Sequence, residues 1–367
     1  MSLWCDKYRP KTLNDLDYNF EQASLIRSLV ASPNFPHLSI FGISGSGKKT
    51  RVNALLYELF GSSAQKLSLG SKIVETTSGK KIEQRYISSN YHIEVNPSAN
   101  GFNDRLVIQE LIKDVATGGS LSKKHPFKVI VINEADRLTK EAQQALRRTL
   151  EKYVSTCRVI LVGERVSRLI PALRSRVFGI RNPAPSYEEI SKVLKNISNA
   201  ENIIQLWPDK ERFKEDCNQV AINSERNLRR AILIFQALCA SSAVGKPKPQ
   251  LLGFKWYEKI KLIARKLVES QSIKKVPEIR AMLFDLHTHL IPSELVLKIL
   301  MKELLKNCLD EDMRFNMIKL AAITDHRLST GNKSVIHLEY FVVTFMVLFR
   351  SSVEKVAFDL DDSMDVD

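Results

Sequence analysis

Gly42-Ile43-Ser44-Gly45-Ser46-Gly47-Lys48 is the stretch of this sequence that decides the fold, because it fits the phosphate-loop pattern G-x-x-x-x-G-K. The apolar residues 37–41 before it predict a short buried strand, and helical spacing of apolar residues over 52–59 predicts a helix. In this context backbone N–H groups and a helix N-terminus can bind phosphate. We therefore predict a nucleotide site, with Lys48 supplying positive charge to the outer phosphates. A glycine-rich turn without a ligand is the alternative.

Strands and helices alternate along the first half of the chain. The apolar runs over 127–132 and 158–163 predict buried parallel strands, and the segment 139–153 between them has a helical pattern. Alternating apolar residues over 80–95 indicate further strands, and 178–180 is the expected last strand. This alternation predicts an α/β fold built on a doubly wound parallel sheet.

Two linkers divide the chain into domains. Pro183 and Pro185 cannot continue a strand ladder, and Ser186 with Glu189 forms a capping-box pattern that predicts the start of a helix. A second linker, rich in proline and glycine, lies at 241–249, and helical patterns fill the sequence beyond it. The predicted parts are a nucleotide-binding domain over 1–182, a helical lid over 183–242, an all-α domain over 250–350 and an acidic, disordered tail over 351–367.

Composition places the chain among ordinary globular proteins. It has 367 residues, too many for one compact core, and 44% of them are apolar and 26% charged. Neither a secretory signal nor an apolar run of about 18 residues stands out, so we expect a soluble intracellular protein with no membrane partner. The five cysteines lie far apart, so we expect neither a disulfide framework nor a metal site.

The charge distribution favours an anionic partner. Lys and Arg number 55 against 41 Asp and Glu, which gives a formal net charge of +14. The segment 351–367 is acidic, so the rest of the chain is more basic still. Such an excess favours contact with nucleic acid. A basic face that is merely solvated is the alternative, because charge alone does not identify a partner.

Two positions depart from the usual chemistry of a nucleotide-hydrolysing site. Lys49 stands where a Ser or Thr hydroxyl normally holds magnesium, and Thr50 comes one residue too late. The strand over 129–132 ends in Asn133, whose amide replaces the carboxylate that would help anchor hydrated magnesium. Glu134 remains at the position of a water-orienting base. We expect the site to bind ATP or ADP better than it cleaves either, with magnesium weak or absent.

The chain resembles a known family at these and other positions. The matching stretches are Trp4-Cys5-Asp6-Lys7-Tyr8-Arg9-Pro10, Gly47-Lys48-Lys49-Thr50 and Ala145-Leu146-Arg147-Arg148-Thr149. They are similar to those of the small subunits of replication factor C, the eukaryotic sliding-clamp loader of the AAA+ class. The resemblance spans almost the whole length and is strongest for the subunit type whose ATP site is degenerate. It implies an AAA+ domain, a lid, and an all-α collar domain for oligomerisation.

The resemblance also implies roles for individual residues. Arg176 matches the arginine that reaches into the ATP site of the neighbouring subunit, although Val177 replaces the cysteine of the family motif. Arg229 matches a lid residue that contacts the phosphates, and Glu164 stands where the family usually has asparagine. The implied nucleotide-binding residues are Cys5, Tyr8, Arg9, Pro10, Gly42, Ile43, Ser44, Gly45, Ser46, Gly47, Lys48, Lys49, Thr50 and Arg229. The implied catalytic residues are Arg176 and Glu134.

Clamp loaders of this family follow the phosphates of primer–template DNA, which requires basic residues at intervals. Arg105 and Lys113 lie on a helix expected over 104–115, about 80° apart around its axis, so they share one face. Arg85 is the third DNA-binding candidate, and a solvated basic face is the alternative for each. We expect the sliding clamp to contact residues 136–143.

The expected function is that of a subunit in the heteropentameric, ATP-driven clamp loader. Its partners would be other replication factor C subunits, alternative large subunits, the sliding clamp and primer–template DNA, in replication and repair in the nucleus. The chain alone is not expected to be an active ATPase. A self-contained P-loop ATPase or helicase-type motor is the first alternative, against which Lys49 and Asn133 argue. A pure scaffold subunit with a vestigial pocket is the second.

Overall fold

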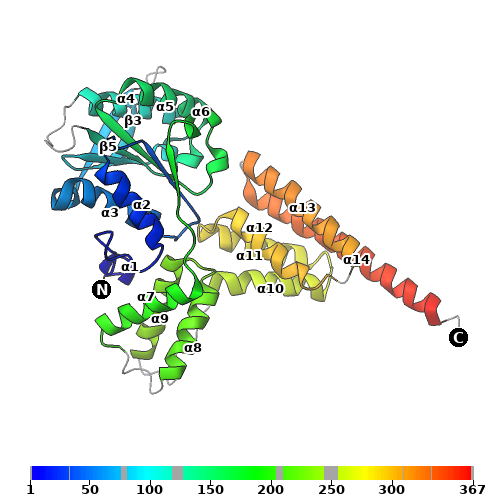
Figure 1. Ribbon diagram of the computed structural model, residues 1–367. Coiled ribbons are helices and arrows are strands. Elements are labelled where there is room, and N and C mark those ends of the chain that lie inside the picture. Colours follow the sequence, from blue (N-terminus) through cyan, green and yellow to red (C-terminus); the bar gives the residue numbers. More distant parts are fainter. Residues whose placement is uncertain are drawn as a thin grey trace. The chain divides into compact units, whose positions relative to one another are not determined.

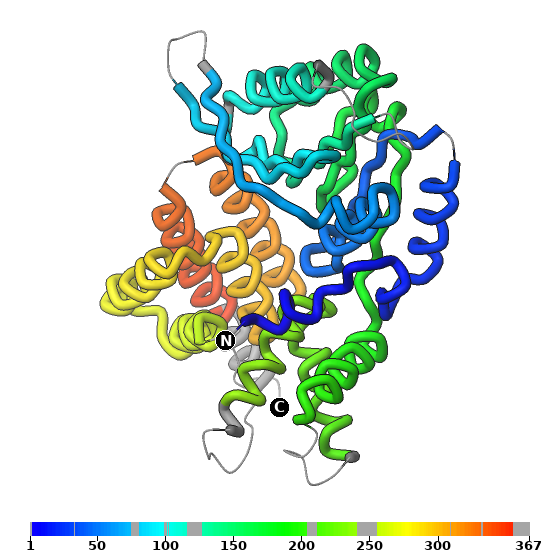
Figure 2. Tube along the Cα trace, turned by 90° about the vertical axis from the view of Figure 1, so that its left-hand side faces the viewer, coloured from blue at the N-terminus to red at the C-terminus, as the bar shows by residue number. Residues whose placement is uncertain are grey.

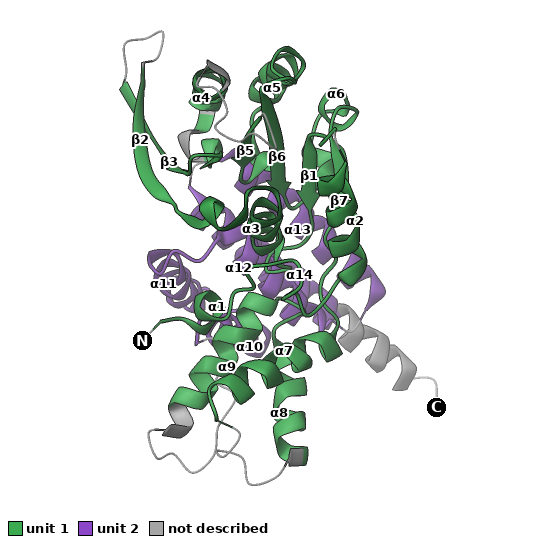
Figure 3. Cartoon of the chain, turned by 60° about the vertical axis from the view of Figure 1, so that its left-hand side comes forward, with its two compact units in different colours: residues 1–251 green, residues 252–367 purple. Residues whose placement is uncertain are grey.

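The structure is a computed structural model and describes residues 2–32, 34–75, 81–117, 127–203, 210–243, 255–308, 310–331 and 333–364. The chain divides into two compact units, residues 1–251 and 252–367, which Figure 3 distinguishes by colour. The first unit contains the predicted nucleotide-binding and lid domains. The second contains the predicted all-α domain and tail.

A seven-stranded sheet forms the centre of the first unit, with the strand order β2-β3-β4-β5-β6-β1-β7. The strands β4, β5, β6, β1 and β7 are parallel, whereas β3 is antiparallel to both β2 and β4. The strands are β1 Leu38–Phe41, β2 Ser68–Glu75, β3 Lys81–Ser88, β4 His92–Val95, β5 Lys128–Ile132, β6 Cys157–Gly163 and β7 Phe178–Arg181. This arrangement confirms the predicted α/β fold.

Helices cover both faces of the sheet. The helices of this domain are α1 Trp4–Lys7, α2 Phe20–Ala31, α3 Lys48–Phe60, α4 Asp104–Thr117, α5 Lys140–Lys152 and α6 Pro171–Arg174, with short 3-10 turns at Gly61–Gln65, Pro97–Asn103, Ala135–Arg137 and Val166–Arg168. The α2–α3 side packs on Val129 and Val131 of β5, and the α4–α5 side packs on Ile130 and Ile132 (Figure 1). The continuous apolar run of β5 is therefore explained by burial on both faces.

The edge strand β2 is a strand that the sequence analysis missed. Leu69 and Ile73 are exposed, whereas Val74 is fully buried. Most side chains of β2 are exposed, so the strand has too little apolar alternation to be predicted from the sequence. Together with β3 it forms a hairpin that extends the parallel part of the sheet at one edge.

The lid consists of α7 Tyr187–Ala200, α8 Lys210–Asn223 and α9 Leu228–Ala243. The predicted capping box is present at the start of α7. The backbone N–H of Glu189 donates to Ser186 Oγ at 3.1 Å, and the backbone N–H of Ser186 donates to Glu189 Oε2 at 2.7 Å. The lid helix therefore begins directly after the two prolines. Most of the predicted second linker lies outside the described residues.

Replacing Ser186 by alanine is expected to destabilise the first unit by about 1 kcal/mol, because an N-terminal N–H of α7 loses its acceptor. Denaturant unfolding of the full chain measures this change. Lys192→Ala, at an exposed position of the same helix, is the control and is expected to change the free energy of unfolding by less than about 0.5 kcal/mol. Equal effects of the two variants would contradict the capping role.

The described residues of the second unit form helices joined by short connections, which agrees with the predicted all-α fold. Its helices are α10 Lys255–Glu269, α11 Lys275–Thr288, α12 Ser293–Leu305, α13 Glu311–Thr330 and α14 Ser334–Met364. Fully buried side chains such as Ile263, Leu300, Phe341 and Phe345 form one continuous core. The apolar periodicity of this part of the chain thus corresponds to the inner faces of the helices.

The acidic end differs from the expected disorder, because α14 continues as far as Met364. Helix propagation costs little once a buried segment has nucleated the helix, and an ion pair of Arg350 Nε with Glu354 Oε1 at 2.9 Å supports this stretch. The predicted tail residues 365–367 lie outside the described residues.

One described helix segment, Ser334–Glu354 within α14, is long and apolar enough to cross a bilayer by length and composition, contrary to the sequence-based expectation. Its inner face is the core face of the second unit, where Leu338, Phe341 and Phe345 are buried. Length and composition do not distinguish such a core helix from a membrane span.

Candidate nucleotide-binding site

A cavity of about 550 Å³ lies where the phosphate loop, the N-terminal segment (residues 2–19), the β2–β3 hairpin and the lid meet. The predicted nucleotide-binding residues that line it are Cys5, Tyr8, Arg9, Pro10, Ser44, Gly45, Gly47, Lys48, Lys49, Thr50 and Arg229. Glu134, Glu164 and Arg85 line it as well. The predicted residues Gly42, Ile43 and Ser46 belong to the loop but are not among the lining residues. The fold thus brings together distant parts of the sequence at one site.

The glycines of the loop are required by the close approach of other segments. Gly45 and Gly47 have φ angles of 73° and 86°, a region that residues with a Cβ rarely adopt. A Cβ on Gly47 would lie 2.1 Å from the Tyr18 hydroxyl, and one on Gly45 would lie 1.8 Å from Asn227 Oδ1. The loop is therefore packed between the N-terminal segment and the start of the lid helix α9.

Lys48 lies at the first position of α3, directly beside the loop. Its ammonium donates to the backbone oxygens of Gly42 at 2.7 Å and Ile43 at 2.8 Å. Burial lowers the pKa of Lys48, while the carboxylates of Glu164 and Asp136 act in the opposite direction. The ammonium is thus already held at the loop, where an anion would replace its carbonyl partners.

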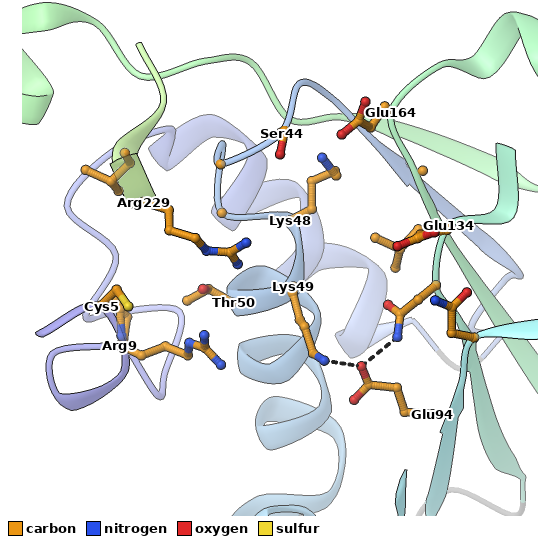
Figure 4. A pocket seen from close by; sticks show the side chains of 18 of the residues that line it. Cys5, Arg9, Ser44, Lys48, Lys49, Thr50, Glu94, Glu134, Glu164 and Arg229 are labelled. Carbon is orange, nitrogen blue, oxygen red and sulfur yellow. Dashed lines mark hydrogen bonds and ion pairs between the residues drawn. The ribbon is translucent and has the colours of Figure 1, made fainter. Parts of the chain in front are cut away.

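Lys49 and Asn133, the two unusual residues, meet at one carboxylate. Lys49 Nζ lies 2.6 Å from Glu94 Oε1, and Asn133 Nδ2 donates to the same oxygen at 2.7 Å (Figure 4). The Glu94 side chain on β4 is only 10% exposed, whereas that of Lys49 is 43% exposed. The sequence analysis did not assign Glu94 to the site, and only the pairing of β4 with β5 places it beside Asn133.

This arrangement does not suit a magnesium ion. Magnesium prefers oxygen ligands, carboxylates above all, in octahedral geometry. Lys49 offers an ammonium without a free electron pair, and Asn133 turns its amide nitrogen toward Glu94. Among the described residues, no group of three or more His, Cys, Asp or Glu side chains is placed to hold a metal ion.

Glu134, at the position of the water-orienting base, is bound to two side chains. Its Oε2 accepts a hydrogen bond from Ser98 Oγ at 3.2 Å and forms an ion pair with Arg137 Nη1 at 3.2 Å. Its φ angle of 52° places it in the left-handed region, at the turn between β5 and the 3-10 turn Ala135–Arg137. The carboxylate is thus partly neutralised.

Part of the cavity lining is apolar. The N-terminal segment contributes Cys5, Tyr8 and Pro10, and the lid contributes residues that the sequence analysis did not assign. These lid residues are Val193, Ile197, Leu228 and Ile232. They follow helical periodicity in the sequence, but only packing decides that this face lines a cavity. Such a wall suits the base of a nucleotide.

The N-terminal segment is attached to the lid, and Figure 2 follows its path beside the lid helices. The backbone N–H of Trp4 donates to Gln236 Oε1 at 3.0 Å, and the Trp4 ring lies 6.0 Å from that of Phe235. Lys7 Nζ pairs with Glu201 Oε1 at 2.7 Å. The apolar lining residues of the N-terminal segment and those of the lid therefore belong to parts of the chain that pack against one another.

Three cationic side chains extend toward the same space in Figure 4: Arg9 from the N-terminal segment, Lys49 from α3 and Arg229 from the start of α9. With Lys48 they place four cations in the cavity lining, which also carries the carboxylates of Glu94, Glu134, Asp136 and Glu164. Cationic side chains in such a cavity attract a polyphosphate.

Three other predicted site residues, Arg176, Arg105 and Lys113, are not among the residues that line this cavity. Arg176 follows α6 and forms an ion pair through Nε with Glu151 Oε1 at 2.5 Å, while its Nη1 donates to the Ala172 carbonyl at 2.8 Å. Arg105 and Lys113 lie on α4 and are both exposed, as their expected common face requires. Arg85, the third DNA-binding candidate, is instead one of the residues that line the cavity.

Comparison with known proteins identifies the family. The family model described as "Replication factor C subunit 3, C-terminal domain" matches residues 256–353, and that described as "DNA polymerase III, delta subunit" matches residues 21–185. Replication factor C subunit 3 of Bos taurus is 43% identical over 356 residues, with 96% of this chain and 98% of the relative covered. The chain belongs to the replication factor C subunit family. This result confirms the predicted family.

Further relatives agree with the predicted subunit type within replication factor C, which is called subunit 3 in animals and subunit 5 in budding yeast. Subunit 5 of Saccharomyces cerevisiae is 39% identical over 94% of this chain and 99% of its own length. The family model over residues 256–353 also agrees with the predicted collar fold of the second unit. A RuvB of Thermotoga maritima matches with a TM-score of 0.47 and 14% identity over 70% of this chain and 79% of that chain, too low to carry an argument.

Proposed function

We propose that the chain is a subunit of the heteropentameric clamp loader that opens the sliding clamp and loads it at primer–template junctions. In this assembly it holds ATP or ADP at a site that does not hydrolyse it, and it contributes Arg176 to the site of a neighbouring subunit. The proposal that the site holds nucleotide without hydrolysing it is supported by the contact of Lys49 and Asn133 with Glu94.

The proposal that the site binds a nucleotide rests on the positive charge of its side chains. Lys48, Lys49, Arg9 and Arg229 surround the space beside the loop, and the N-terminus of α3 adds its backbone N–H groups. Lys49 is partly exposed and pairs with a nearly buried carboxylate, so it can move to a phosphate while Asn133 continues to satisfy Glu94. The phosphate charge is then neutralised by side chains alone.

The lack of hydrolysis follows from the same residues. Phosphoryl transfer to water requires charge stabilisation by a metal ion and an oriented attacking water. Lys49 supplies no metal ligand, Asn133 offers a neutral amide in place of a carboxylate, and Glu134 is held by Arg137 and Ser98. Glu164 adds a carboxylate near Lys48, where a neutral side chain would favour the γ-phosphate. The site therefore retains nucleotide without turning it over.

ADP binding is expected to depend little on magnesium. Because side chains carry the positive charge, exchanging magnesium for EDTA is expected to change the ADP affinity of the purified chain by less than about threefold. Isothermal titration in the two buffers measures this. In the double variant K49T/N133D the hydroxyl and the carboxylate are restored, and magnesium is expected to strengthen ADP binding at least about tenfold. A magnesium requirement of that size in the wild-type chain would contradict the proposal.

Two experiments separate this function from its alternatives. A self-contained ATPase or helicase-type motor would hydrolyse ATP in the presence of magnesium as an isolated chain, so a substantial turnover rate would favour it over our proposal. A scaffold with a vestigial pocket would purify without nucleotide. Native mass spectrometry of the purified assembly detects bound ATP or ADP directly and distinguishes the two nucleotides.

The contacts that we propose with DNA, the sliding clamp and the other subunits are based on family membership and on exposed charge. Arg105 and Lys113 extend from one exposed face of α4 and would follow DNA phosphates, with binding that weakens steeply as salt rises. Residues 136–143 would contact the clamp, and the second unit would join the collar formed with the other subunits or alternative large subunits. Replication and repair of chromosomal DNA place this assembly in the nucleus.

A further inference from the structure

A buried arginine lies at the start of the P-loop helix and is not part of the cavity wall. Arg51 follows Lys48, Lys49 and Thr50 on α3, yet its side chain is only 1% exposed. A guanidinium is rarely buried unless its donors are satisfied. Its Nη1 donates to the Asn19 carbonyl at 3.3 Å and its Nη2 to the Tyr18 carbonyl at 3.4 Å. The fork of the guanidinium therefore holds two successive peptide groups of the N-terminal segment.

These two residues connect in turn to the phosphate loop and to the linker before the lid. The Tyr18 hydroxyl donates to the Ser46 carbonyl of the loop at 2.9 Å. Asn19 Nδ2 donates to the Pro183 carbonyl of the linker at 3.1 Å. Burial raises the pKa of Tyr18 to about 12, so its hydroxyl remains a donor at neutral pH.

The linker also binds the loop directly. Asn182 is 1% exposed, and its Nδ2 donates to the Ser46 carbonyl at 2.7 Å. Its backbone N–H donates to the Phe41 carbonyl at the end of β1, also at 2.7 Å. A Cβ on Gly42 would lie only 2.1 Å from the Asn182 carbonyl oxygen. The Ser46 carbonyl is therefore held from one side by the N-terminal segment and from the other by the linker.

The three connected segments carry the three parts of the nucleotide site. The N-terminal segment carries part of the base-side wall, the linker leads to the lid with Arg229, and the loop receives the phosphates. A nucleotide would occupy two half-sites, with its base at the base-side wall and its phosphates at the loop. Such a ligand gains affinity when the two half-sites are held at the correct distance from one another. We propose that Arg51 is a positioning residue, which holds the base-side segment and the lid linker in register with the phosphate loop.

This inference rests on the proposed nucleotide binding and makes a distinct prediction. Without Arg51 each half-site remains, but the two are no longer fixed relative to one another. ADP, which bridges both, is expected to bind more weakly, whereas adenosine and pyrophosphate, which each occupy one half, are expected to bind almost as before. A direct charge effect would weaken pyrophosphate as well, and a general loss of structure would weaken all three ligands.

The test uses the full chain with Arg51→Met, which keeps the length of the side chain but removes the fork. Titration calorimetry is expected to show ADP binding weakened roughly tenfold or more, with adenosine and pyrophosphate, measured by competition, within about twofold of wild type. Arg51→Lys, which keeps the charge, is expected to lose nearly as much ADP affinity, because one ammonium cannot replace the fork. Arg27→Met, at an exposed arginine of α2, is the matched control and is expected to bind all three ligands normally.

Tyr18→Phe provides a second route should Arg51→Met fail to fold. It removes only the hydroxyl that reaches Ser46, and it is expected to weaken ADP about fivefold with the same selectivity over the two half-ligands. Unchanged ADP affinity in the variants, or equal losses for all three ligands, would overturn the positioning role. Wild-type protein that fails to bind ADP would instead refute the proposed nucleotide site, so the two failures are distinguishable.

Discussion

ATP hydrolysis at the neighbouring subunit's site is expected to fall on the order of a thousandfold when Arg176 is replaced by alanine, because a trans guanidinium stabilises the charge that develops on the transferred phosphoryl group. In this chain Arg176 lies outside its own cavity and is held by Glu151 on α5 and by the Ala172 carbonyl. That attachment fixes the arginine as part of the folded domain. Because Arg176 does not line the cavity, the substitution is expected to leave the nucleotide affinity of this chain unchanged.

The measurement is single-turnover hydrolysis in an assembly in which the neighbouring site is the only competent one, combined with ADP titration of the isolated chain. Arg174→Ala is the control, since Arg174 is an exposed arginine at the end of the same short helix. A full hydrolysis rate in the Arg176→Ala assembly would exclude the trans role. So would a comparable loss in the control variant, because the effect would then be a general change of surface charge.

Nucleotide affinity is expected to fall about a hundredfold when Lys48 is replaced by alanine, since a charge-assisted contact to the phosphates is lost beside a partly buried loop. Lys48 is bound to the Gly42 and Ile43 carbonyls, so the substitution also removes two contacts within the loop. Binding of DNA by the assembly is expected to change much less, because two of the three candidate DNA residues, Arg105 and Lys113, lie on α4 and do not line the cavity.

Titration of ADP into the purified variant measures the first effect, and a denaturant unfolding curve shows whether the loop contacts contribute to stability. Lys66→Ala, at an exposed lysine outside the cavity, is the control and is expected to bind ADP normally. If Lys48→Ala bound ADP as tightly as the control, the phosphates would have to lie elsewhere, and the loop would be only a structural turn.

The phosphate loop and the parallel sheet could be predicted because their signals are local. The loop is a run of consecutive residues, and β5 and β6 are continuous apolar runs whose meaning does not depend on their partners. The capping box at Ser186 is equally local. By contrast, β2 was missed because most of its side chains are exposed and leave little apolar alternation, and the helix beyond 351 was missed because composition alone suggested disorder.

The site itself was predicted only in part, for a similar reason. Lys49 and Asn133 could be recognised as unusual from their places in two motifs, but the carboxylate that receives both could not. Glu94 reaches them only because β4 pairs with β5 in the sheet. The lid residues Val193 and Ile232 likewise have ordinary helical spacing, and only packing turns them toward the cavity.

The amino-acid sequence by itself determined which chemistry is present: a loop for phosphates, two lysines beside it, an amide in place of an acid, and membership of one family. Only the tertiary structure decided which groups meet, including the Lys49–Glu94 pair and the buried connections from Arg51 through Tyr18 to Ser46. The physical reason is that a hydrogen bond or an ion pair depends on distances of a few ångström between atoms. Those distances are set by sheet register and core packing, not by separation along the chain.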